Sequence, residues 1–549
     1  MILCASAHSL FRSVKCNAFY TLYHSSAAST ILNTGIRLLY VIQFTLSHSL
    51  LRFTASSEHL PLVLISLITV DGLSSSFQNF MVYLFHHNSH GKEIIMKILV
   101  INGSPKANYS ITLQTVLYLE KLFPRQKFTY LNAGAQIKLL EKDFSSARTA
   151  LETADLLLFS YPVYTFIAPS QLHRFIELVK ASGIDLSGKY ATQITTSKHF
   201  YDVTAHRYIQ DNCQDLGLKF IHGLSADMDD LLSKKGQMEA RKFFSYVLWS
   251  VKHKSFEPLP APRTPAPHIA VTVPQNAASD GNAHSAAKKV AIVTDCRMED
   301  TQLKSMIERF QAVLPCESRV INIREYPMRG GCLGCFHCAS DGKCIYTDGF
   351  DRFLREEIQT SDAIVYAFTI SDHSMGSVFK CYDDRQFCNG HRTVTMGSPI
   401  GYLISGSYSA EPNLQMILEG RSQVGGNFLA GVATDETDPD HEIDRLALTL
   451  NYALSHRHTQ PQNFYGVGGM KIFRDLIYLM QGMMKADHQF YKAHGQYDFP
   501  QKHRGTLLKM YLVGALLSSP KLKEKAGSHI NEGMIAPYKK VVEGAKRRH

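Results

Sequence analysis

Short apolar runs alternate with amphipathic stretches from Met96 to Val251. Each run is too short for a helical face and is typical of a buried parallel strand. The predicted strands are Ile98–Asn102, Lys127–Leu131, Asp155–Ser160, Tyr190–Thr195 and Lys219–Leu224. Apolar positions at helical spacing predict helices over Ser110–Leu122, Ser145–Glu152, Pro169–Ala181, Ala205–Asp215 and Lys234–Val251. Strands that alternate with helices in this way predict a doubly wound parallel α/β sheet.

A second alternation of the same kind begins at Lys288. It predicts strands over Val290–Thr294, Arg319–Ile323, Asp362–Phe368, Gly401–Ser405 and Gly426–Val432, and helices that begin at Asp300, Gly349, Gly376, Glu411 and His441. The chain therefore duplicates one fold, with modules at 96–252 and 288–460 joined by a Pro/Ala-rich linker at 253–287. Amphipathic stretches at Met470–Ala486 and Leu507–Leu517 predict a helical C-terminal region, 461–549, that serves in core or interface packing.

Residues 1–95 form an atypical N-terminal extension. They are rich in Ser, His and Leu, and their longest apolar stretches, Ile36–Phe44 and Leu60–Val70, are too short to span a bilayer. No basic segment leads to a small-residue cleavage site. Because Met96 directly precedes the first strand, we expect 1–95 to be translated upstream sequence outside the fold. A membrane-associating leader is the alternative.

The composition fits a globular protein of several domains. The 549 residues are 45% hydrophobic and 19% charged, and the formal net charge of +10 is spread along the chain. Basic residues are not interleaved with aromatic ones, so we expect no nucleic-acid partner. Eleven cysteines in so long a chain are not a secreted disulfide framework, and we expect a cytoplasmic protein. No Ser/His/Asp arrangement or HExxH motif favours a hydrolase.

The turn after the first strand carries the first candidate site. Residues 97–112 are Lys-Ile-Leu-Val-Ile-Asn-Gly-Ser-Pro-Lys-Ala-Asn-Tyr-Ser-Ile-Thr, which predicts a strand, a polar loop and a helix start. The unpaired N–H groups of the first helical turn favour an anion, and hydroxyls of Ser104, Ser110 and Thr112 can add hydrogen bonds to phosphate oxygens. The pattern is neither G-x-G-x-x-G nor a P-loop. An ordinary strand–helix turn with a Ser N-cap is the alternative.

The loops after the third and fourth strands belong to the same predicted site, because doubly wound sheets bind ligands beyond the carboxyl ends of their strands. Pro162, Tyr164 and Phe166 can form a flat apolar wall, while N–H groups around Val163–Thr165 can meet a polar ring edge. The loop at 195–201 combines polar and aromatic residues. A flavin needs this mixture of apolar faces, ring-edge donors and a phosphate cradle. A packed surface turn is the alternative for the aromatic loop.

Residues 96–250 resemble flavodoxin-like NAD(P)H-dependent FMN reductases. The motifs are G-S-P-x(n)-S-x-T after the first strand and Y-P-V-Y-x-F-x-x-P-x-Q-L, followed by R-F-I, after the third. The resemblance implies a flavodoxin-like fold, FMN as cofactor, NAD(P)H as donor and a homodimer. It implies FMN phosphate at Ser104, Ser110, Ile111 and Thr112 with help from Lys106, the ring against Pro162, Val163, Tyr164, Thr165 and Phe166, and the other ring edge at Thr196, Ser197 and Lys198.

The second module adds a four-cysteine motif. It is Cys332-Leu-Gly-Cys335-Phe-His-Cys338-Ala-Ser-Asp-Gly-Lys-Cys344. Four thiolates suit a [4Fe–4S] cluster or tetrahedral zinc, and C-x2-C-x2-C is more typical of iron–sulfur sites. The spacing resembles that of iron–sulfur flavoproteins, which implies a cluster. Free thiols or a redox disulfide are the alternative. The remaining cysteines, Cys388 among them, show no ligand spacing and are expected to be buried or incidental.

The first loop of the second module argues against a bound phosphate. It lacks Gly-Ser-Pro and carries Asp295, Glu299 and Asp300 at that place. Two unit charges about 5 Å apart repel by roughly 3 kcal/mol at an effective dielectric near 20. This exceeds the about 0.3–1 kcal/mol that a helix terminus offers an anion, so flavin is disfavoured here. Nevertheless, Thr369–Lys380 followed by Asp384-Arg385 resembles a flavin loop and helix of the family.

These patterns together predict a two-module flavoprotein oxidoreductase. FMN in the first module would accept electrons from NAD(P)H and pass them through the cysteine centre to a small-molecule or protein acceptor. The alternatives are an electron carrier or interaction protein that binds FMN without substrate turnover, and a fold kept without a cofactor.

Overall fold

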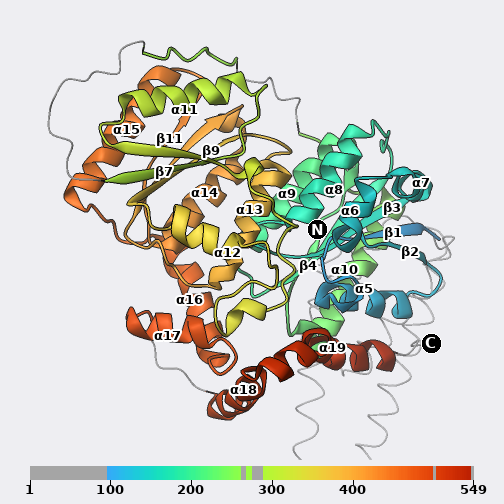
Figure 1. Ribbon diagram of the computed structural model, residues 1–549. Coiled ribbons are helices and arrows are strands. Elements are labelled where there is room, and N and C mark those ends of the chain that lie inside the picture. The colour runs from blue at the N-terminus through green and yellow to red at the C-terminus, as the bar shows by residue number, and fades with distance from the viewer. Residues whose placement is uncertain (1–94, 261–266, 275–287, 499–502, 546–549) are drawn as a thin grey trace, which may run out of the picture. The chain divides into compact units, whose positions relative to one another are not determined.

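The computed structural model describes residues 95–260, 267–274, 288–498 and 503–545. The prediction for the N-terminal extension falls almost wholly outside these residues. Figure 1 shows two α/β modules followed by C-terminal helices. Among the described residues, no helix is long and apolar enough to cross a bilayer.

The first module is a parallel sheet with the strand order β2-β1-β3-β4-β5, to which β6 adds by pairing with β4. Its strands are β1 (Lys97–Asn102), β2 (Lys127–Leu131), β3 (Leu156–Pro162), β4 (Tyr190–Ser197), β5 (Lys219–Phe220) and β6 (Leu224–Asp227). The predicted fifth strand is therefore two short strands. Tyr190 pairs with Lys219, but Ile194 pairs with Leu224, so one extra residue interrupts the ladder between them.

The helices of the first module follow the predicted alternation, with one addition. They are α5 (Ile111–Leu122), α6 (Ala133–Leu140), α7 (Ser145–Thr153), α8 (Ser170–Ala181), α9 (Asp202–Asp215) and α10 (Lys234–His253). Helix α6 was not predicted, because it is short and carries Gly134 in its first turn. That glycine lies so close to the backbone of Gly103 and Ser104 that no Cβ would fit, which ties α6 to the first loop.

The second module repeats this architecture, with the strand order β8-β7-β9-β10-β11. Its strands are β7 (Lys289–Thr294), β8 (Glu317–Asn322), β9 (Ala363–Thr369), β10 (Pro399–Ser405) and β11 (Phe428–Thr434). Its helices are α11 (Thr301–Val313), α12 (Phe350–Phe353), α13 (Gly376–Arg385), α14 (Pro412–Gly425) and α15 (Pro439–His456). The predicted fold class, two tandem flavodoxin-like doubly wound modules with a helical C-terminal extension, is confirmed.

The C-terminal region consists of α16 (Phe464–Leu479), α17 (Lys485–Ala493), α18 (Arg504–Leu517) and α19 (Pro520–Gly544). The predicted helix over Met470–Ala486 is broken after Leu479. Gly482 lies in the break against the backbone of α18, where no Cβ would fit. Tyr538 and Val542 of α19 belong to the buried cluster that contains β1 and α5 of the first module. The tail therefore returns to the first module.

Helices α8 and α13 occupy equivalent places in their modules, and each bonds the start of the other. Glu177 of α8 accepts hydrogen bonds from Ser377 N (2.7 Å) and Ser377 Oγ (2.7 Å). Asp384 of α13 accepts one from Ser170 N at 2.7 Å. Each acid stands seven residues after the serine of its own helix. The two modules are thus related by a local two-fold repetition of the same contact.

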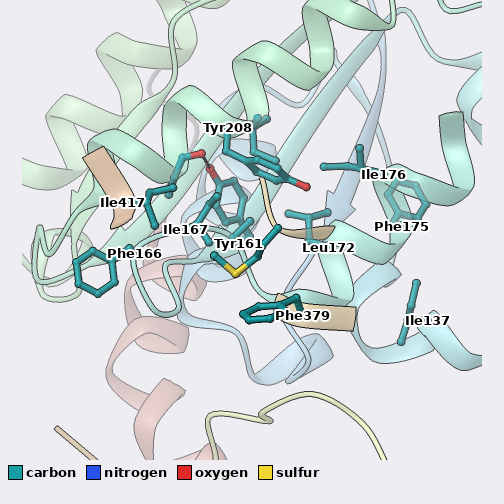
Figure 2. Packing of buried hydrophobic residues seen from close by; sticks show 14 of the residues in the cluster. Ile137, Tyr161, Phe166, Ile167, Leu172, Phe175, Ile176, Tyr208, Phe379 and Ile417 are labelled. Atoms are coloured by element: carbon teal, nitrogen blue, oxygen red, sulfur yellow. Dashed lines mark hydrogen bonds between the residues drawn. The ribbon is translucent and has the colours of Figure 1, made fainter. Parts of the chain in front are cut away.

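The two modules also share one buried core. Figure 2 shows Tyr161, Leu172 and Tyr208 of the first module with Phe379 and Ile417 of the second. All five side chains are at most 4% exposed. Burial of several large apolar side chains is the main favourable term in such an interface. The carboxyl ends of β1, β3 and β4 are thereby held next to the second module.

Candidate functional site

A cavity of about 620 Å³ lies at the carboxyl ends of β1, β3 and β4. Small-molecule sites typically occupy about 300–1,000 Å³. Every residue that the sequence predicted for the cofactor lines this cavity, and so do all four cysteines of the predicted centre. The structure thus brings the two predicted sites, more than a hundred residues apart, into one space. Their binding roles stay predictions.

The loop after β1 is shaped by the side chain of Asn102. Its Nδ2 donates to the carbonyl of Ala107 at 3.0 Å and its Oδ1 accepts from Ser104 N at 3.2 Å. Ser110 caps α5 by accepting from Leu113 N at 3.4 Å. Within the described chain, no acceptor is found for the amides of Ile111 and Thr112, which belong to the first helical turn. These amides are the donors that an anion would need.

The far end of the same cradle is closed by a contact between α5 and β4. The hydroxyls of Thr112 and Thr196 lie 2.6 Å apart. Both side chains are buried and both residues line the cavity. The predicted phosphate loop and the predicted loop after β4 are therefore joined at one point.

The loop after β3 forms a tight turn. Tyr164 and Ile167 exchange backbone hydrogen bonds of 2.8 and 3.1 Å, and Thr165 and Phe166 have positive φ values of 40° and 73°. The Tyr164 amide is consumed in this turn, which corrects the expectation that all N–H groups around it are free. Phe166 packs against Tyr201 with ring centroids 4.3 Å apart. The apolar wall is therefore preformed.

The second module fixes this turn from behind. Thr165 Oγ1 donates to Asp384 at 2.8 Å, and Lys380 Nζ donates to the carbonyl of Tyr164 at 3.0 Å. Lys380 also pairs with Asp384 and, at 3.3 Å, with Asp383. Backbone strain of the kind seen at Thr165 persists only where surrounding contacts hold it. Sequence reasoning missed Lys380 because nothing local links it to the turn.

The pKa values of Lys198 and Lys106 are shifted in opposite directions. Burial disfavours the charged form of Lys198, but salt bridges of 2.7 Å to Asp227 and to Asp229 outweigh it and raise the pKa. Burial lowers the pKa of Lys106, while nearby Cys335 and Cys332 oppose the shift. Lys106 lines the cavity and lies between the loop after β1 and the cysteine motif.

The cysteine loop packs directly onto the loop after β1 and the start of α8. Lys106 Nζ lies 5.4 Å from the ring centroid of Phe336, and Gln171 Nε2 donates to the carbonyl of Cys332 at 3.3 Å. Gly334, at a φ of 59°, faces the Tyr164 hydroxyl so closely that no side chain would fit. The loop therefore forms one wall of the cavity.

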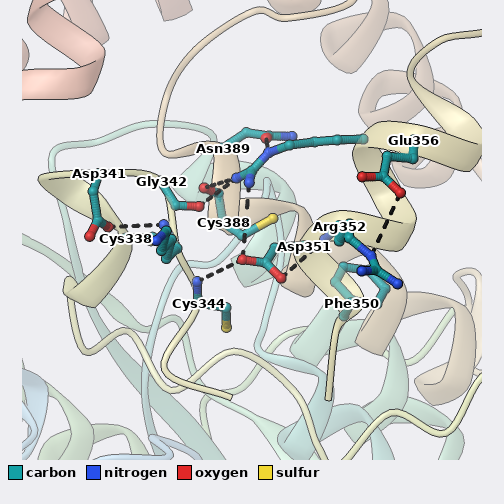
Figure 3. Close-up of polar contacts among 12 residues, drawn as sticks. Cys338, Asp341, Gly342, Cys344, Phe350, Asp351, Arg352, Glu356, Cys388 and Asn389 are labelled. Carbon is teal, nitrogen blue, oxygen red and sulfur yellow. Dashed lines mark hydrogen bonds and ion pairs between the residues drawn. The ribbon is translucent and has the colours of Figure 1, made fainter. Parts of the chain in front are cut away.

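A further thiol, Cys388, joins the predicted cysteines. It is buried, lines the cavity and lies near Cys338 and Cys344 (Figure 3). Cys338 Sγ donates to the carbonyl of Phe387 at 3.1 Å, and the Cys344 amide donates to Asp351 at 3.2 Å. Burial raises the pKa of Cys338 and of Cys388 to about 12. Cys388 is buried, as one of the two sequence-based expectations had it, but its position beside the cysteine motif was not predicted.

The thiols as they lie do not form a metal site. Among the described residues, no group of three or more His, Cys, Asp or Glu side chains is placed to hold a metal ion. Instead, guanidinium groups hold the loop: Arg355 donates to the carbonyls of Gly342 and Cys388, and Arg392 donates to that of Asn389 at 2.7 Å. The predicted [4Fe–4S] cluster and zinc ion therefore have no ready ligand set here.

The C-terminal region supplies the opposite wall. Ile472, Phe473, Leu476, Leu479 and Met480 of α16 and its end line the cavity, as do Met484 and Met534. The sequence predicted packing for these residues and assigned none of them to the site. Arg421 of α14 was missed as well: it pairs with Asp383 and lies over the Phe166 ring at 5.6 Å. These contributions come from distant segments that carry no recognisable motif.

In the second module, residues of the predicted linker lie next to the residue after β11 and the first turn of α11, at the carboxyl edge of the sheet. His268 Nδ1 lies 2.9 Å from Asp435 Oδ2, and the Ile269 amide donates to the Asp435 carbonyl at 2.8 Å. Gln302 in the first turn of α11 donates to the carbonyl of Ile269. Asp295 lies in the first loop, where burial raises its pKa to about 6 despite Arg324 at 3.1 Å. Residues 268 and 269 and the carboxylates of Asp295 and Asp435 thus lie at this edge of the second module, and the prediction that flavin is disfavoured here stays a prediction.

Comparisons with known proteins agree with the fold of the first module. Residues 96–226 match the family model described as "Flavodoxin-like fold". No curated protein matches the chain.

Several solved structures are similar over a module's length. One is the NAD(P)H:quinone oxidoreductase from Methanothermobacter marburgensis, with 14% identity over 29% of this chain and 98% of that chain and a TM-score of 0.24. Another is the general stress protein 14 from Treponema denticola in complex with FMN. The match has 16% identity, covers 28% of this chain and 99% of that chain, and has a TM-score of 0.24. A third is the FMN-dependent NADH-azoreductase from Bacillus anthracis in complex with FMN. The match has 14% identity, covers 29% of this chain and 100% of that chain, and has a TM-score of 0.22.

Proposed function

We propose that the chain is a flavin-dependent oxidoreductase that binds FMN in the cavity and accepts electrons from NAD(P)H. The observation that carries the proposal is that Ile111 and Thr112, whose amides have no acceptor among the described residues, line a cavity of about 620 Å³ together with the apolar turn after β3. Unbonded amides at a helix start are donors for phosphate oxygens.

The proposed roles follow from the contacts of each loop. Ser104, Ser110, Ile111 and Thr112 would hold the phosphate, with Lys106 beside it. Pro162, Val163, Tyr164, Thr165 and Phe166 would lie along the ring, and Thr196, Ser197 and Lys198 would meet its other edge. When bound, FMN supplies the ring that accepts a hydride or electrons. The apolar side chains of α16 would keep water from that ring.

We place the cysteine loop in the proposal as a thiol-lined wall without a metal. The sequence-based [4Fe–4S] prediction stays a prediction, because the described thiols offer no ready ligand set. Iron and acid-labile sulfide analysis of protein purified without oxygen tests it. Stoichiometric iron and sulfide that are lost together on Cys338→Ser would support a cluster, whereas their absence would leave a thiol wall.

The test uses the full chain purified with its natural pigment. We expect a flavin absorption spectrum, FMN in the heat-released supernatant, and NADH or NADPH oxidation in the presence of a quinone or free flavin. Thr112→Glu should remove FMN, because a carboxylate at the helix start repels phosphate by roughly 3 kcal/mol at about 5 Å. Thr149→Glu, on the exposed face of α7, is the matched control and should stay yellow.

Two outcomes separate this proposal from its alternatives. Bound FMN without NAD(P)H oxidation would favour an electron carrier. A colourless wild-type protein that does not take up added FMN, or a Thr112→Glu variant with full FMN content, would contradict the proposed site.

A further inference from the structure

Helix α18 presents an apolar outer face that no other element of the described residues covers. Leu508, Leu512 and Leu516 are 63%, 62% and 61% exposed, and their four-residue spacing places them in one stripe along the helix. Leu522 at the start of α19, 44% exposed, continues the apolar surface. Isolated exposed leucines are ordinary, but a continuous stripe of this kind marks an interaction surface.

The inner face of the same helix is firmly attached. Gly514 touches the backbone of Gly482 with no space for a Cβ on either residue. Tyr511 Oη donates to Gln481 Oε1 at 2.6 Å, and Lys485 Nζ donates to Ser518 Oγ at 2.6 Å. The orientation of α18 is therefore fixed by its neighbours, and the leucine stripe faces outward because of it.

Basic residues surround the stripe. Arg504, Lys509, Lys521 and Lys525 are all exposed, and Glu524 is the single acidic residue between 503 and 525. Arg504 and Lys509 belong to α18 and Lys521 and Lys525 to α19, and exposed basic groups beside an apolar helix face are attracted to anionic lipid headgroups.

We propose that α18 docks the protein on an anionic lipid surface. A second copy of the chain is the less suitable occupant for two reasons. The outer face of a 14-residue helix offers only about 200 Å², whereas a stable protein interface needs about 800 Å² from each partner. A symmetric pairing would also bring the same basic residues of both copies together.

Docking through this face would bring the cavity close to the lipid. The turn that holds α18 contains Met480 and Met484, and both line the cavity. The cavity wall would then stand about one helix diameter, roughly 10 Å, from the lipid surface.

The test is co-sedimentation of the full chain with vesicles of phosphatidylcholine, alone or mixed with phosphatidylglycerol. We expect binding to the anionic vesicles that weakens as salt is raised. Leu508→Glu/Leu512→Glu should lower the partition coefficient at least about tenfold, because two leucines no longer leave water. The matched control is Leu448→Glu/Tyr452→Glu on α15, where both residues are exposed and four positions apart. It should bind as the wild type does.

Lys509→Glu/Lys521→Glu provides a second variant that leaves the apolar stripe intact. It should weaken binding to the anionic vesicles and flatten the salt dependence. Circular dichroism and the thermal midpoint check that each variant is folded, and neither these readouts nor vesicle binding depends on flavin. The proposal is overturned if the wild type does not bind anionic vesicles, or if the α18 and α15 variants bind equally. It is also overturned if light scattering shows a dimer that Leu508→Glu/Leu512→Glu dissociates.

Discussion

At the residue scale, one buried lysine joins the two modules behind the cavity. Lys380 has no exposed surface, and it contacts the Tyr164 carbonyl, Asp383 and Asp384. Asp383 has a second partner in Arg421, whereas among the described residues Lys380 is the one cation that forms an ion pair with Asp384. A buried charge is tolerated only while it is paired, so Asp384 depends on this lysine.

Lys380→Met should therefore destabilise the protein strongly. We expect a loss of about 3–5 kcal/mol in the free energy of unfolding, the usual cost of leaving one buried charge unpaired. Denaturant unfolding of the wild type and the variant measures it. Lys380→Met/Asp384→Asn should recover much of the loss, because the unpaired charge is gone. Equal instability of the single and double variants would show that the carboxylate is not the cause.

His373 gives the interface a pH dependence. Burial disfavours its charged form, but Asp215 (2.8 Å) and Glu411 (2.9 Å) outweigh this and raise the pKa to about 9 from an ordinary 6.5. The folded state thus binds the proton more tightly than the unfolded state, so this contribution is complete below about pH 6.5 and is lost as pH rises through about 9. Thermal midpoints measured from pH 6 to pH 9.5 should fall more steeply for the wild type than for His373→Gln. Parallel curves would assign the dependence to other groups.

Site residues differ in how far the sequence could predict them. Ser104, Tyr164 and Thr196 each follow a predicted strand, and the carboxyl ends of parallel strands meet at one edge, so their convergence was predictable. Lys380 and Cys388 come from the other module. The pairing of the two modules depends on how their surfaces pack, and the local periodicity of a sequence does not predict that packing.

At the element scale, part of the predicted linker packs on the second module. Residues 267–274 contact the end of β11 and the start of α11 through His268, Ile269 and Gln302. Thr272 extends the contact along the module, with its amide 3.0 Å from Asp440 and its carbonyl accepting from Arg309. An anionic ligand would have to displace this segment and approach Asp435.

The chain should accordingly bind one FMN, not two. Heat-released FMN, quantified against protein by amino-acid analysis after saturation with added FMN, should approach one per chain. Asp295→Ser/Asp435→Asn relieves charge in the second module but leaves the segment in place, so the ratio should not change. Two FMN per chain in the wild type would contradict the prediction that the second module does not bind FMN.

The boundaries of an element were predictable where its pattern of apolar residues was sustained. The prediction failed where tertiary contacts set the boundary. The strands β1 to β4 were predicted to within two residues, and β1 and β3 are sustained apolar runs. The break between α16 and α17 was not, because it follows from the close approach of α18 at Gly482. The C-terminal region was predicted to be helical, but the bounds of α19 were not predicted, since its pattern is interrupted by Pro537.

At the scale of the whole molecule, the two modules face each other through contacts that each module repeats. The reciprocal bonds of Glu177 and Asp384 repeat one contact twice, and the turns Tyr164–Ile167 and Ser371–Ser374 each bond to the opposite module. Tyr208 Oη and Asn212 Nδ2 both contact Asp372, the counterpart of Thr165. The duplication was predictable from the sequence, but its face-to-face pairing was not.

This pairing should survive a cut in the linker. A protease site inserted within residues 261–266 would separate the first module from the second while leaving 267–274 with the second. Because large apolar side chains and the hydrogen bonds of Glu177 and Asp384 cross the interface, we expect the nicked protein to elute from gel filtration as one species and to keep its FMN. Phe379→Glu, which places a charge in the shared core, should make the nicked fragments separate. Separation of the nicked wild type would mean that the covalent linker, not the interface, holds the cavity together.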